Sequence, residues 1–162
     1  MTNKAYFDWN DIQEMTRRVG DQIKRSNWQP DYIVGLTRGG LVPAVILSHY
    51  LSVPCETLKV ALRDGDEQES CYWMAEDAYE GKNILIIDDI NDTGDTLLWI
   101  QENWRDAHYP SNDRWDSIWG DNVRVAVLHN NAPSKFDNVT YVASDIDKSE
   151  EPVWIVYPWE TE

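Results

Sequence analysis

The sequence predicts an α/β protein built on a mostly parallel sheet with helices on both faces. Short apolar segments of strand length alternate with longer segments that have helical periodicity. The segment NILIIDD, at 83–89, is apolar at consecutive positions, which is typical of a strand covered on both faces. The 162 residues fit one domain, 1–162, because no stretch rich in Pro, Gly or Ser divides them.

The first half of the chain contains two expected helices and two expected strands. The first helix begins after Asp8 or Asn10, either of which could cap it, and its apolar residues recur at helical spacing: Ile12, Met15, Val19 and Ile23. DYIVGL at 31–36 is a predicted strand, and LVPAVILSHYL at 41–51 is a predicted helix with Pro43 in its first turn. CETLKVAL at 55–62 is the next predicted strand.

A long acidic excursion follows. Residues 63–79 have little periodicity, so we expect a loop, and we define a mobile flap over about 61–79.

The second half returns to the alternating pattern. After the strand at 83–89, GDTLLWIQENWRDA predicts a helix, and 108–122 is a polar connection that contains tryptophan. The remaining apolar segments predict two strands and an extended tail, at 123–129, 139–144 and 153–159.

Composition limits the classes of function. The 14 basic and 29 acidic residues give a net charge of −15, which argues against a nucleic-acid-binding face but permits a small phosphorylated ligand. Cys55 and Cys71 have neither metal-ligand spacing nor a disulfide framework. The start of the chain is polar, and its longest apolar run is too short for a membrane span, so we expect a cytoplasmic protein.

The turn DTGDT, at 92–96, has the features of an anion site. Gly94 permits close approach of a ligand, Thr93 and Thr96 supply hydroxyl groups, and the following helix start offers N–H groups. The same turn could instead be a simple helix start capped by Asp92.

Two further features adjoin predicted strand ends. Asp88 and Asp89 point to opposite faces of a strand, and such a pair can hold a sugar diol or a hydrated Mg²⁺; two solvated aspartates are the alternative. TRGG, at 37–40, places Arg38 beside two glycines, which suits phosphate but also suits an ordinary surface turn. Since both segments follow strands, both should open onto the carboxyl edge of the sheet.

These motifs resemble those of a known family. ILIIDDINDTGDTL is similar to the phosphoribosyl-diphosphate (PRPP) motif of type I phosphoribosyltransferases, and LTRGGLVP is similar to their pyrophosphate loop. YFDWNDIQ and WIVYPWE resemble the xanthine-guanine (6-oxopurine) branch, in which W-I-x-x-P-W forms a hood over the base. The resemblance implies a type I phosphoribosyltransferase-like sheet with a flap and a C-terminal base hood at about 145–162.

The resemblance also implies roles for individual residues. Asp88 and Asp89 would bind the ribose hydroxyls of PRPP, with Mg²⁺ held mainly by PRPP and Asp89 as a further ligand, and Asp92 would accept a proton near the purine imidazole nitrogen. The pyrophosphate would lie on Thr37, Arg38 and Gly39, in a loop that often has a cis peptide in this family. The 5′-phosphate would lie on the turn made by Thr93, Gly94, Asp95 and Thr96.

The base site matches the family less completely. Trp154 would stack on the base, and the backbone of Ile155 would read its edge. The 6-oxopurine branch has a base-reading lysine where this chain has Asn130 or Asn131, with Lys135 later. An asparagine amide both donates and accepts, so the choice of base stays open. The flap has Arg63 in place of the branch's Ser-Tyr pair.

The expected function is Mg²⁺-dependent transfer of the phosphoribosyl group of PRPP to guanine, xanthine or hypoxanthine, with release of pyrophosphate, in purine salvage. The resemblance and the nine tryptophans favour a homo-oligomer, a dimer or a tetramer. The alternatives are a phosphoribosyltransferase for another base and a non-catalytic regulator that senses PRPP or a nucleotide on the same fold.

Overall fold

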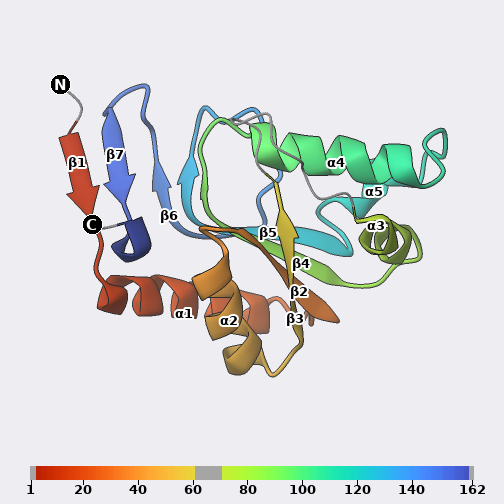
Figure 1. Ribbon diagram of the computed structural model, residues 1–162, viewed down its shortest axis with the longest axis horizontal. Coiled ribbons are helices and arrows are strands. Elements are labelled where there is room, and N and C mark those ends of the chain that lie inside the picture. The colour runs from red at the N-terminus through yellow and green to blue at the C-terminus, as the bar shows by residue number, and fades with distance from the viewer. Residues whose placement is uncertain (1–2, 61–70, 161–162) are drawn as a thin grey trace.

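A five-stranded parallel sheet forms the centre of the molecule in the computed structural model, which describes residues 3–60 and 71–160 (Figure 1). The strand order is β3-β2-β4-β5-β6, and every neighbouring pair is parallel. The predicted fold class is therefore confirmed. The strands are β2 (Tyr32–Thr37), β3 (Cys55–Lys59), β4 (Ile84–Asn91), β5 (Val123–Asn131) and β6 (Tyr141–Ile146).

Helices cover both faces of this sheet (Figure 1). On one face, α1 (Trp9–Arg25) and α2 (Leu41–Leu51) pack Val19 and Leu47 against Leu85 and Ile87 of β4. The other face carries α3 (Tyr72–Tyr79), α4 (Asp95–Ala107) and α5 (Trp115–Ile118). Among the helices of the described residues, none is long and apolar enough to cross a membrane.

The start of α1 follows the predicted signal. Asp8 is its N-cap: the Asp11 N–H donates to Asp8 Oδ1 at 2.8 Å, and the Asp8 N–H donates to Asp11 Oδ2 at 2.8 Å. This reciprocal pair is a capping box made with two aspartates, and it satisfies two N–H groups at the helix start.

The order of the strands explains where a ligand site can form. The chain runs from β2 outward to β3 and then returns to the other side of β2 with β4. Ligands of such sheets bind outside the carboxyl ends of the strands where the order reverses. The two loops of interest follow β2 and β4, so they lie beside each other at this position.

Two segments differ from the sequence prediction. Residues 72–79, expected to be a loop, form α3, whose residues Met74, Ala75 and Ala78 are buried. The connection 108–122 contains α5 and contributes Trp115, Ile118 and Trp119 to the core. Both helices are too short for a periodic pattern to stand out from a polar sequence. The rest of the proposed flap, residues 61–70 with Arg63, lies outside the described residues.

The end of the segment predicted to form a hood contains a second, two-stranded sheet, and residues 153–160 are called the hood below. Its strand β7 (Val153–Val156) pairs in parallel with β1 (Asn3–Tyr6), and Ala5 lies opposite Ile155. The extended tail of the prediction is therefore a strand followed by a 3₁₀ turn at Pro158–Glu160, and β1 was not predicted. Ile155 and Tyr157 pack with Ile12 of α1 and Leu128 of β5, which fixes the hood beside the sheet.

Candidate active site

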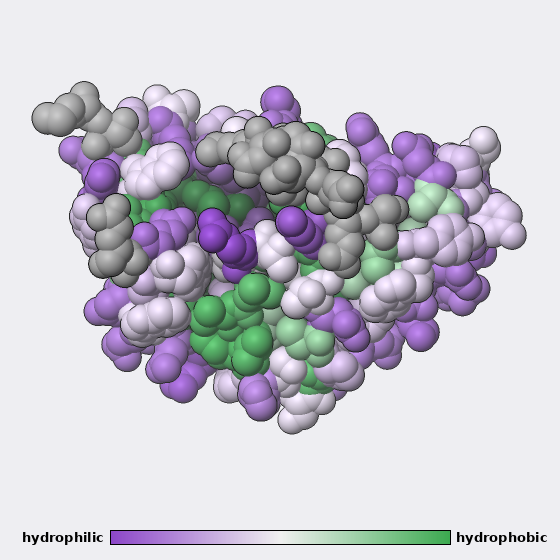
Figure 2. Space-filling view, in the orientation of Figure 1, coloured by the Kyte–Doolittle hydropathy of each residue, from purple (hydrophilic) through white to green (hydrophobic). Residues whose placement is uncertain are grey.

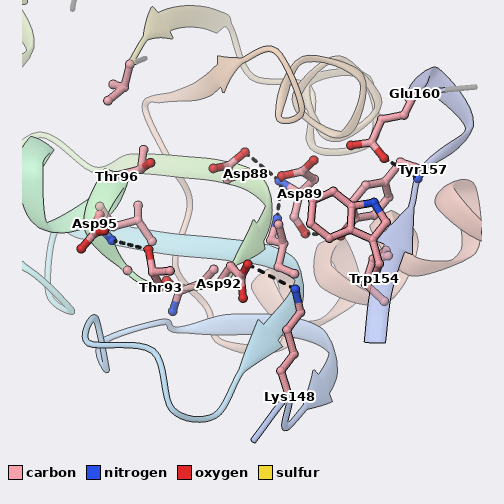
Figure 3. Close-up of a pocket in the computed structure, with 16 residues that line it drawn as sticks. Asp88, Asp89, Asp92, Thr93, Asp95, Thr96, Lys148, Trp154, Tyr157 and Glu160 are labelled. Carbon is pink, nitrogen blue, oxygen red and sulfur yellow. Dashed lines mark hydrogen bonds and ion pairs between the residues drawn. The ribbon is translucent and has the colours of Figure 1, made fainter. Parts of the chain in front are cut away.

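A cavity of about 430 Å³ opens at the carboxyl edge of the sheet (Figure 3). Residues 88–97, at the end of β4 and in the turn that follows, form one wall. The hood and the connection before it form the other wall, with Lys148, Trp154, Ile155, Tyr157 and Glu160. The structure thus places the predicted carboxylates, the anion turn and the hood around one space.

Asp88 and Asp89 lie near the end of β4, and their carboxyl groups are close enough to interact with each other. The Asp89 N–H donates to Asp88 Oδ1 at 2.9 Å, and the Ile90 N–H donates to Asp89 Oδ1 at 2.8 Å. Burial, followed by the negative charge of Asp89, raises the pKa of Asp88 well above its ordinary value. Burial also raises the pKa of Asp89. Both carboxylates therefore lie where a positive charge would be stabilised.

The loop after β2 reaches the same carboxylates from the neighbouring strand. A Cβ atom on Gly39 would overlap the Asp89 carboxylate, so only glycine lets this loop lie so close. The peptide bond between Thr37 and Arg38 is cis, as the family resemblance implied. Arg38 is exposed, and neither it nor Thr37 lines the cavity itself.

The turn after β4 ends at Gly94, which is the N-cap of α4 and has a φ of 91°. No side chain caps this helix, so the alternative in which Asp92 is a simple cap is wrong. A Cβ atom on Gly94 would lie 2.5 Å from the Phe136 backbone nitrogen. The Asp95 N–H donates to Thr93 Oγ1 at 3.3 Å, and the first-turn N–H groups of α4 have no partner within the helix.

Asp92 is held by two residues from other elements. Asn131 Nδ2 donates to the Asp92 carbonyl oxygen at 3.1 Å and to its Oδ1 at 3.2 Å. Lys148 Nζ pairs with Asp92 Oδ2 at 3.2 Å. Sequence reasoning missed Lys148, because it lies in the charged segment DKSEE after β6, within the predicted hood segment but outside its W-I-x-x-P-W motif.

The two asparagines differ from their expected role as base-binding residues. Neither lines the cavity: Asn131 contacts Asp92, and Asn130 Oδ1 accepts from Asn91 Nδ2 at 2.9 Å. Asn91 is buried and also donates to the Phe136 carbonyl oxygen at 2.9 Å, so it joins the turn after β4 to the loop after β5. Lys135 pairs with Asp95 at 3.2 Å, beside the turn after β4.

The hood brings aromatic and polar groups to the cavity. Trp154 is 51% exposed and lines the cavity, with Lys148 Nζ 5.7 Å from its ring centre. The Tyr157 hydroxyl donates to the Asp89 carbonyl oxygen at 3.1 Å and lies 2.8 Å from His129 Nδ1. Burial lowers the pKa of His129 to about 4, so the ring is neutral at physiological pH. Tyr157 therefore joins the hood to Asp89 of β4 and to His129 of β5.

A magnesium ion fits this site as a companion of the ligand. Within residues 3–60 and 71–160, no group of three or more His, Cys, Asp and Glu side chains could hold a metal ion by itself. Asp88 and Asp89 offer the hard oxygen ligands that Mg²⁺ prefers, and a cation would offset the unfavourable burial of their charges. Mg²⁺ commonly completes its shell with water and with phosphate oxygens of a bound ligand.

The family model for the phosphoribosyl transferase domain matches residues 2–162. The chain belongs to this family. It is a phosphoribosyltransferase, an enzyme of the glycosyltransferase type, as the PRPP-like motif after β4 had indicated.

Known proteins similar to this phosphoribosyltransferase include enzymes that act on purines. The hypoxanthine-guanine phosphoribosyltransferase of Schizosaccharomyces pombe is 26% identical over 188 residues, covering 98% of this chain and 90% of the yeast protein. The purine phosphoribosyltransferase from Pyrococcus horikoshii Ot3 superposes with a TM-score of 0.72 at 24% identity, covering 99% of this chain and 96% of that one. The xanthine-guanine-hypoxanthine phosphoribosyltransferase of Helicobacter pylori has a TM-score of 0.69 at 15% identity, with coverage of 98% and 95%.

Proposed function

We propose that this enzyme transfers the 5-phosphoribosyl group of PRPP to a 6-oxopurine (guanine, xanthine or hypoxanthine) and releases pyrophosphate, in purine salvage. One observation carries the proposal: a single cavity has an anion turn, two partly buried carboxylates and an exposed tryptophan on its walls. These three parts match the phosphate, the sugar and the base of the product nucleotide. The S. pombe relative named for hypoxanthine and guanine supports the choice of a purine.

The 5′-phosphate occupies the turn from Thr93 to Thr96. Backbone N–H groups at the start of α4 and the positive end of the helix dipole favour an anion there. Gly94 and the supporting loop at 134–136 keep the turn in shape. The Thr37–Gly39 loop, beside Asp89, holds the leaving pyrophosphate with Arg38.

Asp88 and Asp89 act on the ribose. They accept hydrogen bonds from its hydroxyl groups, and they would provide oxygen ligands for Mg²⁺ bound with PRPP. When bound, the cation supplies charge neutralisation for the departing pyrophosphate. As the bond between C1′ and pyrophosphate breaks, positive charge develops on the sugar, and the two carboxylates stabilise it more than they stabilise the ground state.

Asp92 acts on the base. A purine imidazole nitrogen forms the new bond to C1′, and the proton on the other imidazole nitrogen passes to the Asp92 carboxylate. Asn131 and Lys148 orient that carboxylate before the base arrives. Trp154 stacks on the base, and the backbone of Ile155 contacts its edge.

The proposed organisation is a single domain over 1–162 with its base hood at about 145–162. Since Cys71 and α3 pack into the core, we limit the flap proposal to residues 61–70, which lie outside the described residues. We also propose a homo-oligomer, because α2 is apolar on nearly all sides although one of its sides faces solvent. Val45 there is 51% exposed, and apolar side chains gather over this helix (Figure 2).

The test is a paired substitution, Asp88→Asn with Asp89→Asn, assayed by pyrophosphate release from PRPP and Mg²⁺ with guanine or hypoxanthine. We expect release to fall by at least about 100-fold, the scale of losing preorganised charge stabilisation. The matched control is Asp113→Asn with Asp121→Asn, which removes two exposed carboxylates far from the cavity. Undiminished release by the Asp88/Asp89 variant would show that the carboxylates are not the ribose site.

A further inference from the structure

We propose that Lys148 is the specificity-determining residue that donates to the exocyclic oxygen at C6 of the purine, so that 6-oxopurines are selected over 6-aminopurines. The inference rests on the proposed function and deepens it. It assigns base selection to the segment between β6 and β7, not to the asparagines after β5.

The position of Lys148 is the first observation. Its ammonium group lines the cavity between the Asp92 carboxylate, at 3.2 Å, and the Trp154 ring, whose centre is 5.7 Å away (Figure 3). These are the two groups proposed to accept the base proton and to stack on the base. A purine seated on Trp154 with its imidazole N–H directed at Asp92 therefore brings its neighbouring edge to Lys148.

The chemistry of that purine edge is the second observation. In guanine and hypoxanthine, the exocyclic oxygen lies next to the imidazole nitrogen N7 on the same edge of the ring, whereas adenine carries an amino donor there. An ammonium group has three N–H donors and no acceptor. Lys148 can thus donate one N–H to Asp92 and another to the purine oxygen. It has no acceptor for the amino group of adenine, so that donor would face another donor.

The way Lys148 is held is the third observation. Its side chain is only 21% exposed, and its backbone N–H donates to Asn131 Oδ1 at 2.9 Å. The Asn131 Nδ2 group donates to Asp92 Oδ1. The Asn131 side chain therefore links Asp92, the proposed proton acceptor, to the segment that carries Lys148. Asn131 is therefore a positioning residue, and its amide is already committed to these contacts.

The experiment compares Lys148→Met with the wild-type enzyme on hypoxanthine, adenine and unsubstituted purine, which lacks any group at C6. We expect the kcat/KM for hypoxanthine to fall about 10- to 100-fold, the range for a lost hydrogen bond to a charged group. The kcat/KM for unsubstituted purine should fall much less, so the hypoxanthine-to-purine ratio collapses. Lys82→Met is the matched control, since Lys82 forms a similar pair with Asp77 at 3.6 Å away from the cavity.

A second variant and an equilibrium measurement keep the test independent of turnover. Lys148→Gln supplies an amide that both donates and accepts, so we expect it to raise the adenine-to-hypoxanthine ratio. Calorimetric binding of inosine monophosphate and purine riboside monophosphate should show the same loss of preference in Lys148→Met.

The outcomes separate this inference from the function on which it rests. An equal fall for hypoxanthine and unsubstituted purine would mean that Lys148 only orients Asp92, and it would overturn the inference alone. An unchanged adenine-to-hypoxanthine ratio in Lys148→Gln would do the same. Absence of pyrophosphate release by the wild-type enzyme with every purine would overturn the proposed function and this inference together.

Discussion

The ionised Asp88 side chain lowers the free energy of unfolding of the protein. Its carboxylate is largely removed from water beside that of Asp89, and both effects raise its pKa. The folded state therefore binds this proton more tightly than the unfolded chain does. Ionisation of Asp88 lowers the free energy of unfolding as the pH rises from the unfolded pKa through the raised folded pKa.

We expect Asp88→Asn to stabilise the ligand-free enzyme near neutral pH by about 0.5–2 kcal/mol, while it impairs catalysis. The asparagine side chain has the same shape and no charge to bury. The gain should shrink as the pH falls and vanish below about pH 4, where aspartate is protonated even in the unfolded chain. Urea titrations across this pH range, without PRPP or Mg²⁺, measure the difference. A variant less stable than wild type near neutral pH would contradict the account.

Asp92 should affect the chemical step more than binding of PRPP. Asp92→Asn removes the proposed proton acceptor, and we expect kcat to fall about 10²- to 10⁴-fold while the KM for PRPP stays within a few-fold. Steady-state kinetics with saturating hypoxanthine separate the two parameters. A large rise in the KM for PRPP with an unchanged kcat would place Asp92 in the phosphate site instead.

Some residues of this site could be predicted from a local sequence motif, and others could not. Asp88, Asp89 and Asp92 lie within one contiguous motif, so their presence on one wall could be predicted from the sequence. Lys148 reaches the site only because β5 and β6 are neighbours and Asn131 binds the backbone after β6. The contact between Lys148 and Asp92 depends on tertiary structure, and residue spacing in the sequence does not predict it.

At the scale of elements, the turn between β4 and α4 depends on glycine for two separate reasons. Gly94 has a positive φ, and its α-carbon faces the Phe136 nitrogen closely. Gly94→Ala must therefore move the turn away from the loop at 134–136, in addition to straining the backbone by about 1–2 kcal/mol. We expect the KM for PRPP to rise at least about tenfold, since 1.4 kcal/mol corresponds to a factor of ten.

Gly81→Ala is the matched control for that prediction. Gly81 has a similar φ of 95°, but a Cβ atom there would meet nothing within 4 Å. This variant should lose stability through backbone strain and keep the wild-type KM for PRPP. If the two alanine variants had the same KM for PRPP, contact with the loop at 134–136 would not shape the phosphate site.

The elements that sequence reasoning found are those with long or uniform patterns. The strand at 84–91 and helices α1 and α4 have enough residues for the pattern to be distinct. By contrast, α3 and α5 are short, and their apolar residues are interspersed with acidic and aromatic ones. The pairing of β1 with β7 joins the two ends of the chain, and neither strand has the alternation that would mark it.

At the scale of the whole molecule, the position of the site follows from the order of the strands. The reversal between β2 and β4 brings two separate loops to one edge, and the hood closes the space from the side of β6. A parallel α/β sheet and two strand-end motifs were sufficient to predict this meeting. The shape of the base end required the tertiary contacts of the hood.

The exposed side of α2 should mediate self-association. Val45→Glu places a charge in the apolar patch over this helix, and we expect it to shift the enzyme toward a smaller species at equal concentration. Sedimentation velocity measures the change. Ser111→Glu, in an exposed loop, is the charge-matched control and should leave the distribution as in wild type. A wild-type protein that sediments as a monomer at all concentrations would contradict the proposed oligomer.

The most direct test of the central claim is detection of the product nucleotide. The enzyme is incubated with PRPP, Mg²⁺ and each of a panel of free purines and pyrimidines, and nucleoside monophosphate and pyrophosphate are measured together by chromatography and mass spectrometry. The account predicts equal amounts of both products with guanine, xanthine or hypoxanthine, and little or none with adenine or the pyrimidines. No nucleotide with any 6-oxopurine, or efficient turnover of adenine or a pyrimidine in its place, would contradict it.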